Sequence, residues 1–175
     1  MIFFDTETTG LPVRGCVDPA LQPRIVEIAA IKVNEALEEV GRFETLVNPG
    51  CALPEEAAKL YDITDAMLVG APPFATVLHE HILPFWLGER TVVAYKVDFD
   101  LELMYWELRR LGWEHRFPYC YDIVDAIQHR AGKRISLDKW SAEVLGEAYT
   151  KQTHRAMGDV ERLLECYRSL KSEGD

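Results

Sequence analysis

The chain has 175 residues, of which 48% are hydrophobic, and this suffices for one compact domain with a full core spanning residues 1–175. Its formal net charge of −10 at pH 7 excludes proteins that bind phosphate groups through a broad basic surface. No apolar stretch reaches the length of a membrane span, because Asp5 interrupts the first one after four residues, and no basic segment typical of a signal peptide precedes it.

Three strands are expected in the first part of the chain. Met1–Asp5 reads as a buried strand, and Ile25–Val33 and Val40–Val47 are expected to pair across a hairpin turn at Asn34–Glu39. Pro12–Pro23 is the one long irregular stretch. Because it follows the first strand closely, we expect it to form the mobile lip of a cleft.

The middle of the chain is expected to be mainly helical. Pro54–Tyr61 and Pro73–Leu87 read as helices, each with a proline near its start. Pro84 is expected to kink or break the second helix near its end. The β-branched run Thr91–Tyr95 then predicts a central strand that leads into a helix over Asp98–Leu111.

The last part of the chain adds one expected strand, Tyr119–Ile123, and two expected helices, Leu137–Leu145 and Arg155–Leu170. Strands are thus grouped early, and strands and helices alternate later. This order predicts an α/β fold in which helices flank a mixed sheet.

Two carboxylates, Asp5 and Glu7, end the first apolar run ahead of Gly10. Successive side chains of a strand alternate between its faces, so both carboxylates are expected on the same side. Held side by side they repel each other, and a cation that prefers oxygen ligands, such as Mg²⁺ or Mn²⁺, would remove that penalty. The alternative is that both are turn or N-cap residues.

Two further aspartates lie on the apolar sides of predicted helices. Asp100 precedes Met104 by four residues, and Asp159 precedes Leu163 by four residues. A buried ionised carboxylate is costly unless it is paired or holds a metal ion, which predicts two more metal ligands. The alternatives are a contact with the helix dipole for Asp100 and a salt bridge to a buried arginine for Asp159.

His154 precedes Asp159 by five residues, just before the last helix. Histidine titrates near neutrality and can take a proton from water that a metal ion has acidified. His154 is therefore a candidate general base. The alternative is an exposed loop histidine without a catalytic role.

These segments resemble the motifs of the DnaQ-like 3'–5' exonucleases, the DEDD group. Phe4–Gly10 is similar to the first motif and Val97–Asp100 to the second. His154–Asp159 is similar to the third motif of the histidine branch (DEDDh), HxAxxD. The family's usual spacer, a proline-led helix followed by HGIT, is matched at Asn48–Gly50, Leu53-Pro54 and Ile63-Thr64.

The resemblance implies a ribonuclease H-like fold, a mixed sheet of about five strands flanked by helices. It also implies an exonuclease that releases nucleoside monophosphates from the 3' end of DNA or RNA by hydrolysis with two ions of Mg²⁺ or Mn²⁺. Asp5 would bridge both ions. Glu7 and Asp159 would complete the site of the ion that activates water, and Asp100 would support the second ion. His154 would be the general base.

The resemblance also implies a pocket for the terminal nucleotide, with contacts from Thr8, Leu11, Tyr61, Lys96 and Phe99. Here the chain departs from the family twice: Tyr95-Lys96 replaces the histidine and asparagine of HNxxFD, and Tyr61-Asp62 replaces the first two residues of HGIT. Tyrosine can stack on a base or sugar and Lys96 can meet a phosphate, so the choice between DNA and RNA stays open.

The implied partners are single-stranded or frayed 3' ends of DNA or RNA, together with a polymerase or another replication or repair protein. The negative charge favours a grip on only a few terminal nucleotides, or affinity supplied by a partner. Basic groups that could contact phosphate are Lys96, Arg109, Arg110, Lys151 and Arg155. The chain ends just after its last helix, which favours a free-standing nuclease over a proofreading subunit. Four cysteines without CxxC spacing favour reduced thiols and a cytoplasmic location.

The sequence is also compatible with two other classes of function. One is a non-catalytic module that binds nucleic acid or a partner and retains the exonuclease fold, with its pocket altered at Tyr95 and Lys96. The other is a metal-free acid–base hydrolase that uses Asp5 and Glu7, as glycosidases use two carboxylates. Neighbouring carboxylates of one strand are too close for opposed roles, which need a separation of about 5 Å or more.

Overall fold

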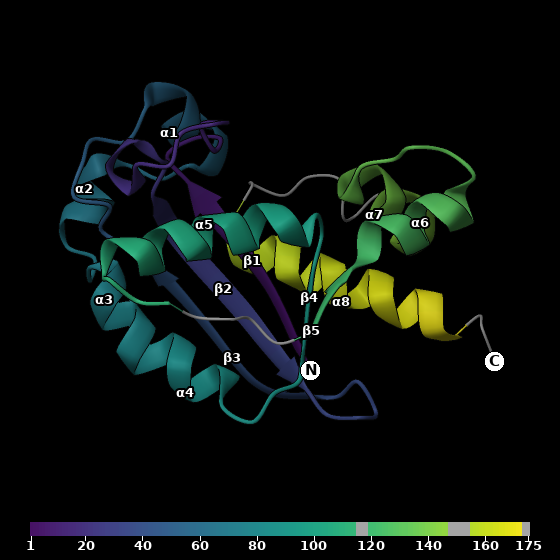
Figure 1. Cartoon of the computed structure of the whole chain (residues 1–175). Coiled ribbons are helices and arrows are strands. Elements are labelled where there is room, and N and C mark those ends of the chain that lie inside the picture. Colours follow the sequence, from purple (N-terminus) through teal and green to yellow (C-terminus); the bar gives the residue numbers. More distant parts are fainter. Residues whose placement is uncertain (115–118, 147–154, 173–175) are drawn as a thin grey trace.

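The computed structural model describes residues 1–114, 119–146 and 155–172, and one sheet forms its centre (Figure 1). The strands are β1 Ile2–Thr8, β2 Ile25–Val33, β3 Glu39–Leu46, β4 Thr91–Ala94 and β5 Tyr119–Asp122. They lie in the order β3-β2-β1-β4-β5, with β1, β2 and β3 antiparallel and β4 and β5 parallel to β1. The predicted mixed sheet is confirmed.

β1 continues three residues beyond its expected end at Asp5, because β2 pairs with it along its whole length. Glu7 lies opposite Glu27, and the register shifts between Glu7 and Thr8. Asp5 and Glu7 are therefore strand residues two positions apart, on one face of the sheet as predicted. The alternative, that they are turn or N-cap residues after a strand, is wrong.

Helices cover both faces of this sheet. α8 (Ala156–Ser172) covers the face on which Phe3 of β1 is buried. α5 (Val97–Arg110) covers the opposite face, where its Leu103 packs in one core cluster with Ile28 of β2. Because side chains alternate along β1, Asp5 and Glu7 lie on the same side as Phe3, beneath α8.

Between β3 and β4, continuous helix packs on the same face as α5. It consists of α3 (Phe74–Val77), a π-helical turn η2 (Leu78–Ile82) and α4 (Leu83–Trp86). Of the kink or break expected at Pro84, the break is not found, since the chain stays helical through this residue. A proline ring clashes with the carbonyl group four residues earlier in an α-helix, and here the wider π turn occupies that position.

Five shorter elements complete the described residues. α1 (Glu55–Tyr61) and α7 (Leu137–Leu145) agree with the predicted helices. The 3-10 turn η1 (Pro19–Leu21), α2 (Asp65–Val69) and α6 (Ile123–Ala131) were not predicted. α6 and α7 lie together beside α8, at the end of the molecule away from α1 and α2 (Figure 1).

Cys16, Cys51 and Cys166 carry free thiols. Cys166, on α8, is buried in the core, whereas Cys51 is exposed. Among the residues that the structure describes, no helix has both the length and the apolar character that a membrane span requires.

Candidate active site

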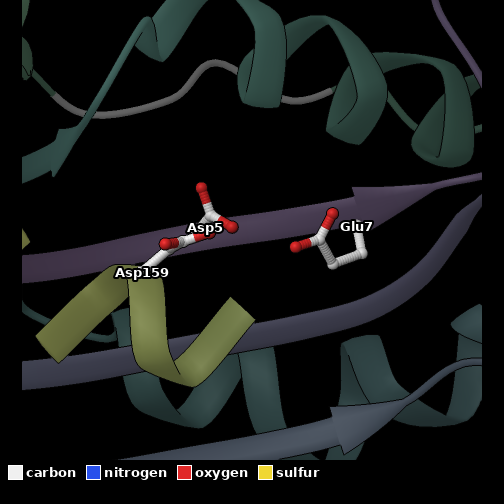
Figure 2. A group of neighbouring side chains, drawn as sticks. All are labelled: Asp5, Glu7 and Asp159. Carbon is white, nitrogen blue, oxygen red and sulfur yellow. The ribbon is translucent and has the colours of Figure 1, made fainter. Parts of the chain in front are cut away.

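β1 and α8 bring three carboxylates together on one face of the sheet (Figure 2). Asp5 and Glu7 project from β1, and Asp159 meets them from the first turn of α8. One oxygen atom of each carboxylate lies within 4.8 Å of the other two. Glu7 is buried, whereas Asp5 and Asp159 keep partial access to solvent. Three of the four predicted metal ligands therefore converge.

The fourth predicted ligand, Asp100, is joined to β1 itself. Its Oδ1 atom accepts one hydrogen bond from the backbone N–H of Thr6, at 3.0 Å, and another from the Thr6 hydroxyl, at 2.7 Å. β4 pairs with β1 at Ile2 and Phe3 and ends at Ala94, so Thr6 lies beyond the end of its neighbouring strand. Asp100 thus satisfies a backbone donor of β1 between Asp5 and Glu7.

Burial and mutual repulsion favour the protonated form of these carboxyl groups. Burial raises the pKa of Asp5 well above its usual value, and the charges of Asp100 and Asp159 raise it further. Burial, followed by the charge of Asp159, raises the pKa of Glu7 to about 9. Burial also raises the pKa of Asp100 to about 7. A nearby cation would favour the ionised forms and lower each of these pKa values.

One buried arginine reaches the acidic group. Arg162 is 3% exposed, and its Nη1 atom lies 3.1 Å from Oδ1 of Asp159 and also pairs with Asp138. The salt bridge considered as an alternative for Asp159 is therefore present, beside the carboxylate cluster. One guanidinium group that is shared between two aspartates does not neutralise the other three carboxylates. The remaining negative charge and the oxygen donors fit Mg²⁺ or Mn²⁺.

Glu27 is a carboxylate of this region that the motifs do not reveal. It lies opposite Glu7 in the pairing of β1 with β2 and is fully buried. It accepts hydrogen bonds from Nε of Arg155, at 2.8 and 3.0 Å, and from the backbone N–H of Ala156, at 2.9 Å. Arg155, expected as a possible phosphate contact, is thus engaged by Glu27. The available signal was a lone carboxylate in the apolar run Ile25–Ile31.

Three of the predicted substrate contacts lie around the end of β1. Thr8 is buried, and its hydroxyl donates a hydrogen bond to the carbonyl of Gly10 at 2.7 Å. Leu11 follows this turn and is 79% exposed. The Tyr61 hydroxyl lies near Glu7, and burial and the Glu7 carboxylate raise the pKa of Tyr61 to about 12. This hydroxyl therefore stays protonated at neutral pH and can donate a hydrogen bond.

Two of the four positions that depart from the family pattern have a left-handed backbone conformation. Asp62, in place of the glycine of HGIT, has a φ of 55°, and Lys96, in place of the asparagine of HNxxFD, has a φ of 62°. Glycine enters this region readily, and asparagine and aspartate do so occasionally, whereas lysine is strained there. The Lys96 side chain is exposed, with its Nζ atom 5.7 Å from the centroid of the Tyr95 ring. Phe99 is half-buried and packs against the core under α5.

Polar side chains hold the irregular stretch that follows β1. The buried Gln22 side chain accepts a hydrogen bond from the Val13 N–H at 2.8 Å and donates to the carbonyl of Cys16 at 2.7 Å. Arg110 of α5 donates to the carbonyls of Pro19 and Gln22, at 3.0 and 2.7 Å. These contacts oppose the mobility that was predicted for this lip. They also engage Arg110, one of the expected phosphate contacts.

His154, the predicted general base, lies outside the residues that the structure describes, as does Lys151. The described chain resumes at Arg155, the residue that follows His154 in the sequence. The role of His154 therefore remains a prediction from the third motif.

Comparison with protein families gives a match to the family RNase_T, described as "Exonuclease", over residues 2–167. Among curated proteins, the DNA polymerase III PolC-type of Staphylococcus aureus is 32% identical over 163 residues. This alignment covers 91% of the present chain and 10% of the polymerase. The chain thus spans about a tenth of the length of the curated relatives that it matches.

Solved structures share the fold at lower sequence identity. Exonuclease X, in complex with 5' overhanging duplex DNA, has 21% identity and a TM-score of 0.65, over 99% of this chain and 93% of that one. The nuclease domain of 3'hExo, a DEDDh family member bound to rAMP, has 17% identity and a TM-score of 0.78, over 99% and 92%. The predicted ribonuclease H-like architecture is confirmed by this likeness.

Proposed function

The chain belongs to the RNase_T family of exonucleases, and from this premise we propose that it is a metal-dependent 3'–5' exonuclease. It would release nucleoside monophosphates from single-stranded or frayed 3' ends, and residues 1–175 would form a single exonuclease domain. The observation that carries the proposal is the convergence of Asp5, Glu7 and Asp159 within 4.8 Å. Asp100 supports it through its two hydrogen bonds to Thr6.

The four carboxylates would hold two divalent cations, Mg²⁺ or Mn²⁺, through Asp5, Glu7, Asp100 and Asp159. When bound, these ions would supply an acidified water molecule and stabilise the charge that develops on the phosphoryl group. His154 would accept the proton of the attacking water. The burial of Glu7 and Asp100 would keep bulk water away from the reacting phosphate and strengthen each charge interaction in the site.

The residues around the end of β1 would bind the terminal nucleotide. Leu11 would contact the base with its exposed side chain, and Phe99 would pack beside it. Thr8 would orient backbone groups of the Gly10 turn toward the nucleotide. Tyr61 would donate a hydrogen bond from its protonated hydroxyl group close to Glu7, and Lys96 would contact a phosphate oxygen.

The proposal also covers the nucleic-acid substrate and the protein partner. A net charge of −10 leaves little long-range attraction for nucleic acid, which supports a grip on a few terminal nucleotides. The match to PolC-type polymerases supports work beside a polymerase or another replication or repair protein. Both DNA and RNA ends are proposed substrates, because the solved neighbours include complexes with duplex DNA and with rAMP.

The experiment uses single-stranded DNA and RNA oligonucleotides labelled at the 5' or the 3' end, with Mg²⁺, Mn²⁺ or EDTA. A 3'–5' exonuclease gives a labelled mononucleotide at once from the 3'-labelled strand and a descending ladder from the 5'-labelled strand. EDTA should abolish both. Asp5→Asn and Asp159→Asn should each lower the rate by at least about 10³-fold, because transition-state stabilisation of several kcal/mol is removed.

The exposed Glu35 in the hairpin turn provides the matched control, and Glu35→Gln should retain the wild-type rate. Cleavage that persists in EDTA would support the metal-free acid–base hydrolase. Tight binding of the oligonucleotides without cleavage in either metal would support the non-catalytic module. A mononucleotide released first from the 5'-labelled strand would reverse the proposed polarity.

A further inference from the structure

We propose that Glu27 is a positioning residue, which acts through Arg155 to fix the start of α8, and with it Asp159, against the carboxylates of β1. The inference deepens the proposed function and rests on it. It concerns Glu27 and Arg155, neither of which is a predicted metal ligand.

The hydrogen bonds that Glu27 accepts from charged and backbone N–H donors come from the first residues of the α8 segment. Its Oε1 atom accepts from Nε of Arg155 at 2.8 Å and from Nη2 of the same guanidinium group. Its Oε2 atom accepts from Nε of Arg155 at 3.0 Å and from the Ala156 backbone N–H at 2.9 Å. Both carboxylate oxygens are thus used. A charged pair with several parallel hydrogen bonds has little orientational freedom.

The pair of Glu27 and Arg155, which we call the clamp, is connected to Asp159 through the helix backbone. The N–H of Asp159 donates to the carbonyl of Arg155 at 3.2 Å, so the clamped residue is the hydrogen-bond partner of the candidate ligand one turn later. At its other end, Glu27 lies opposite Glu7 in the antiparallel pairing of β2 with β1. Short contacts therefore connect Glu7 to Asp159 through β2 and Arg155.

Stability alone does not account for a charge at this position. Glu27 is fully buried in a strand whose neighbours Val26 and Ile28 are apolar, and it lies opposite another carboxylate, Glu7. Replacing a buried ion pair by apolar residues is often neutral or stabilising. An ion pair at this costly position is better explained by the geometry that it imposes on α8, since partners of metal ligands commonly set the orientation of those ligands.

The same arginine offers a matched control. Arg155 also lies 3.7 Å from Oε1 of Glu44 on β3, and this second carboxylate is 40% exposed. An exposed pair at this distance contributes little to structure. Glu44 also lies near Glu27, since burial and the charge of Glu27 raise the pKa of Glu44. Glu44→Gln therefore removes an acidic neighbour of both residues and leaves the hydrogen bonds between Glu27 and Arg155 in place.

The test measures Mn²⁺ binding by calorimetry in the absence of nucleic acid, together with hydrolysis of the p-nitrophenyl ester of thymidine 5'-monophosphate. Glu27→Gln should weaken Mn²⁺ binding by about 10- to 100-fold and lower kcat by a similar factor, with a small change in KM. Glu44→Gln should stay within about twofold of wild type in all three quantities.

A second variant separates positioning from folding. The double variant Glu27→Leu with Arg155→Leu replaces the pair by apolar side chains and should fold with near-wild-type stability. If Glu27 positions Asp159, this variant still shows weakened Mn²⁺ binding and reduced kcat. Wild-type Mn²⁺ affinity and kcat in the double variant would overturn the inference.

The two readouts keep the inference distinct from the proposed function. A wild-type protein that binds Mn²⁺ but does not cleave would refute the nuclease proposal, and the loss of Mn²⁺ affinity in Glu27→Gln would still establish the positioning role. A wild-type protein that cleaves, with Mn²⁺ affinity unchanged by both Glu27 variants, would refute the positioning role alone.

Discussion

The buried pair of Arg162 and Asp159 leads to a prediction about how a cation and an arginine share one carboxylate. We consider Arg162→Met, which keeps a long apolar side chain and removes the charge. Breaking a buried ion pair costs about 3–5 kcal/mol when the remaining charge stays buried. Asp138 is 49% exposed and can be rehydrated, and Asp159 is 19% exposed, so we expect a cost at or just below the lower end of this range.

The free energy of unfolding in EDTA should therefore fall by about 2–3 kcal/mol in Arg162→Met. In saturating Mn²⁺ the loss should shrink below about 1 kcal/mol, because the bound cation then compensates Asp159. By linkage, a difference of about 1.4 kcal/mol between the two conditions requires the variant to bind Mn²⁺ about tenfold more tightly than wild type. Urea denaturation in EDTA and in Mn²⁺ gives both numbers.

A control variant breaks a second ion pair of the same helix. Arg42 pairs with Glu161 of α8, and both side chains are nearly half-exposed. Arg42→Met should cost less than about 1 kcal/mol and should cost the same with and without Mn²⁺. An equal loss in both conditions for Arg162→Met would show that a cation does not compensate Asp159. Weaker Mn²⁺ binding by that variant would mean that Arg162 supports the site rather than competing for it.

Three further results are expected. Lys96→Asn should raise the free energy of unfolding, measured by urea denaturation, by about 0.5–1 kcal/mol, because asparagine tolerates the left-handed backbone better than lysine does. An unchanged denaturation midpoint would show that the backbone of Lys96 is not strained. In EDTA, stability should fall as pH rises from 5 to 9, because Glu7, with a folded-state pKa of about 9, keeps its proton after the unfolded chain has lost it; Mn²⁺ should flatten this slope in a pH series of urea titrations. Arg110→Gln should speed tryptic cleavage at the exposed Arg14 of the lip, whereas Arg109→Gln should not; equal rates would show that Arg110 does not hold the lip.

Much of the sheet could be predicted because its strands are apolar runs bounded by turns. Ile25–Val33 is buried at eight of nine positions, and such a run has few alternatives. α6 was missed because its buried stripe consists of Ile123 and Ile127 alone, too few positions for a clear helical period. The continuation through Pro84 was also not predictable, since it depends on a local change to π-helical hydrogen bonding.

The candidate site was predictable where it depends on local geometry. Alternation along one strand places Asp5 and Glu7 together, and helical spacing places Asp159 on the side of α8 that faces them. The bond from Thr6 to Asp100 was not predictable, because it depends on where β4 ends. Glu27 was missed for a related reason, since its partner Arg155, just before α8, lies 128 residues away in the sequence.

The salt bridge and the metal site were weighed as alternatives for Asp159, and the described contacts contain features of both. A carboxylate has two oxygens and can meet an arginine and a cation at the same time. Sequence spacing predicts which charges approach each other, but the sharing of one charge between partners depends on distances that only the fold supplies.

Thr6 donates two hydrogen bonds to the same oxygen of Asp100, so the sheet itself fixes the position of this proposed ligand before any ion binds. A carboxylate oxygen held in this way is preorganised and resists moving outward to accommodate a larger cation. Oxygen donors surround Mg²⁺ at roughly 2.0–2.1 Å and Ca²⁺ at roughly 2.3–2.6 Å. The hydrogen bonds between Thr6 and Asp100 would therefore also favour the smaller Mg²⁺ over the larger Ca²⁺.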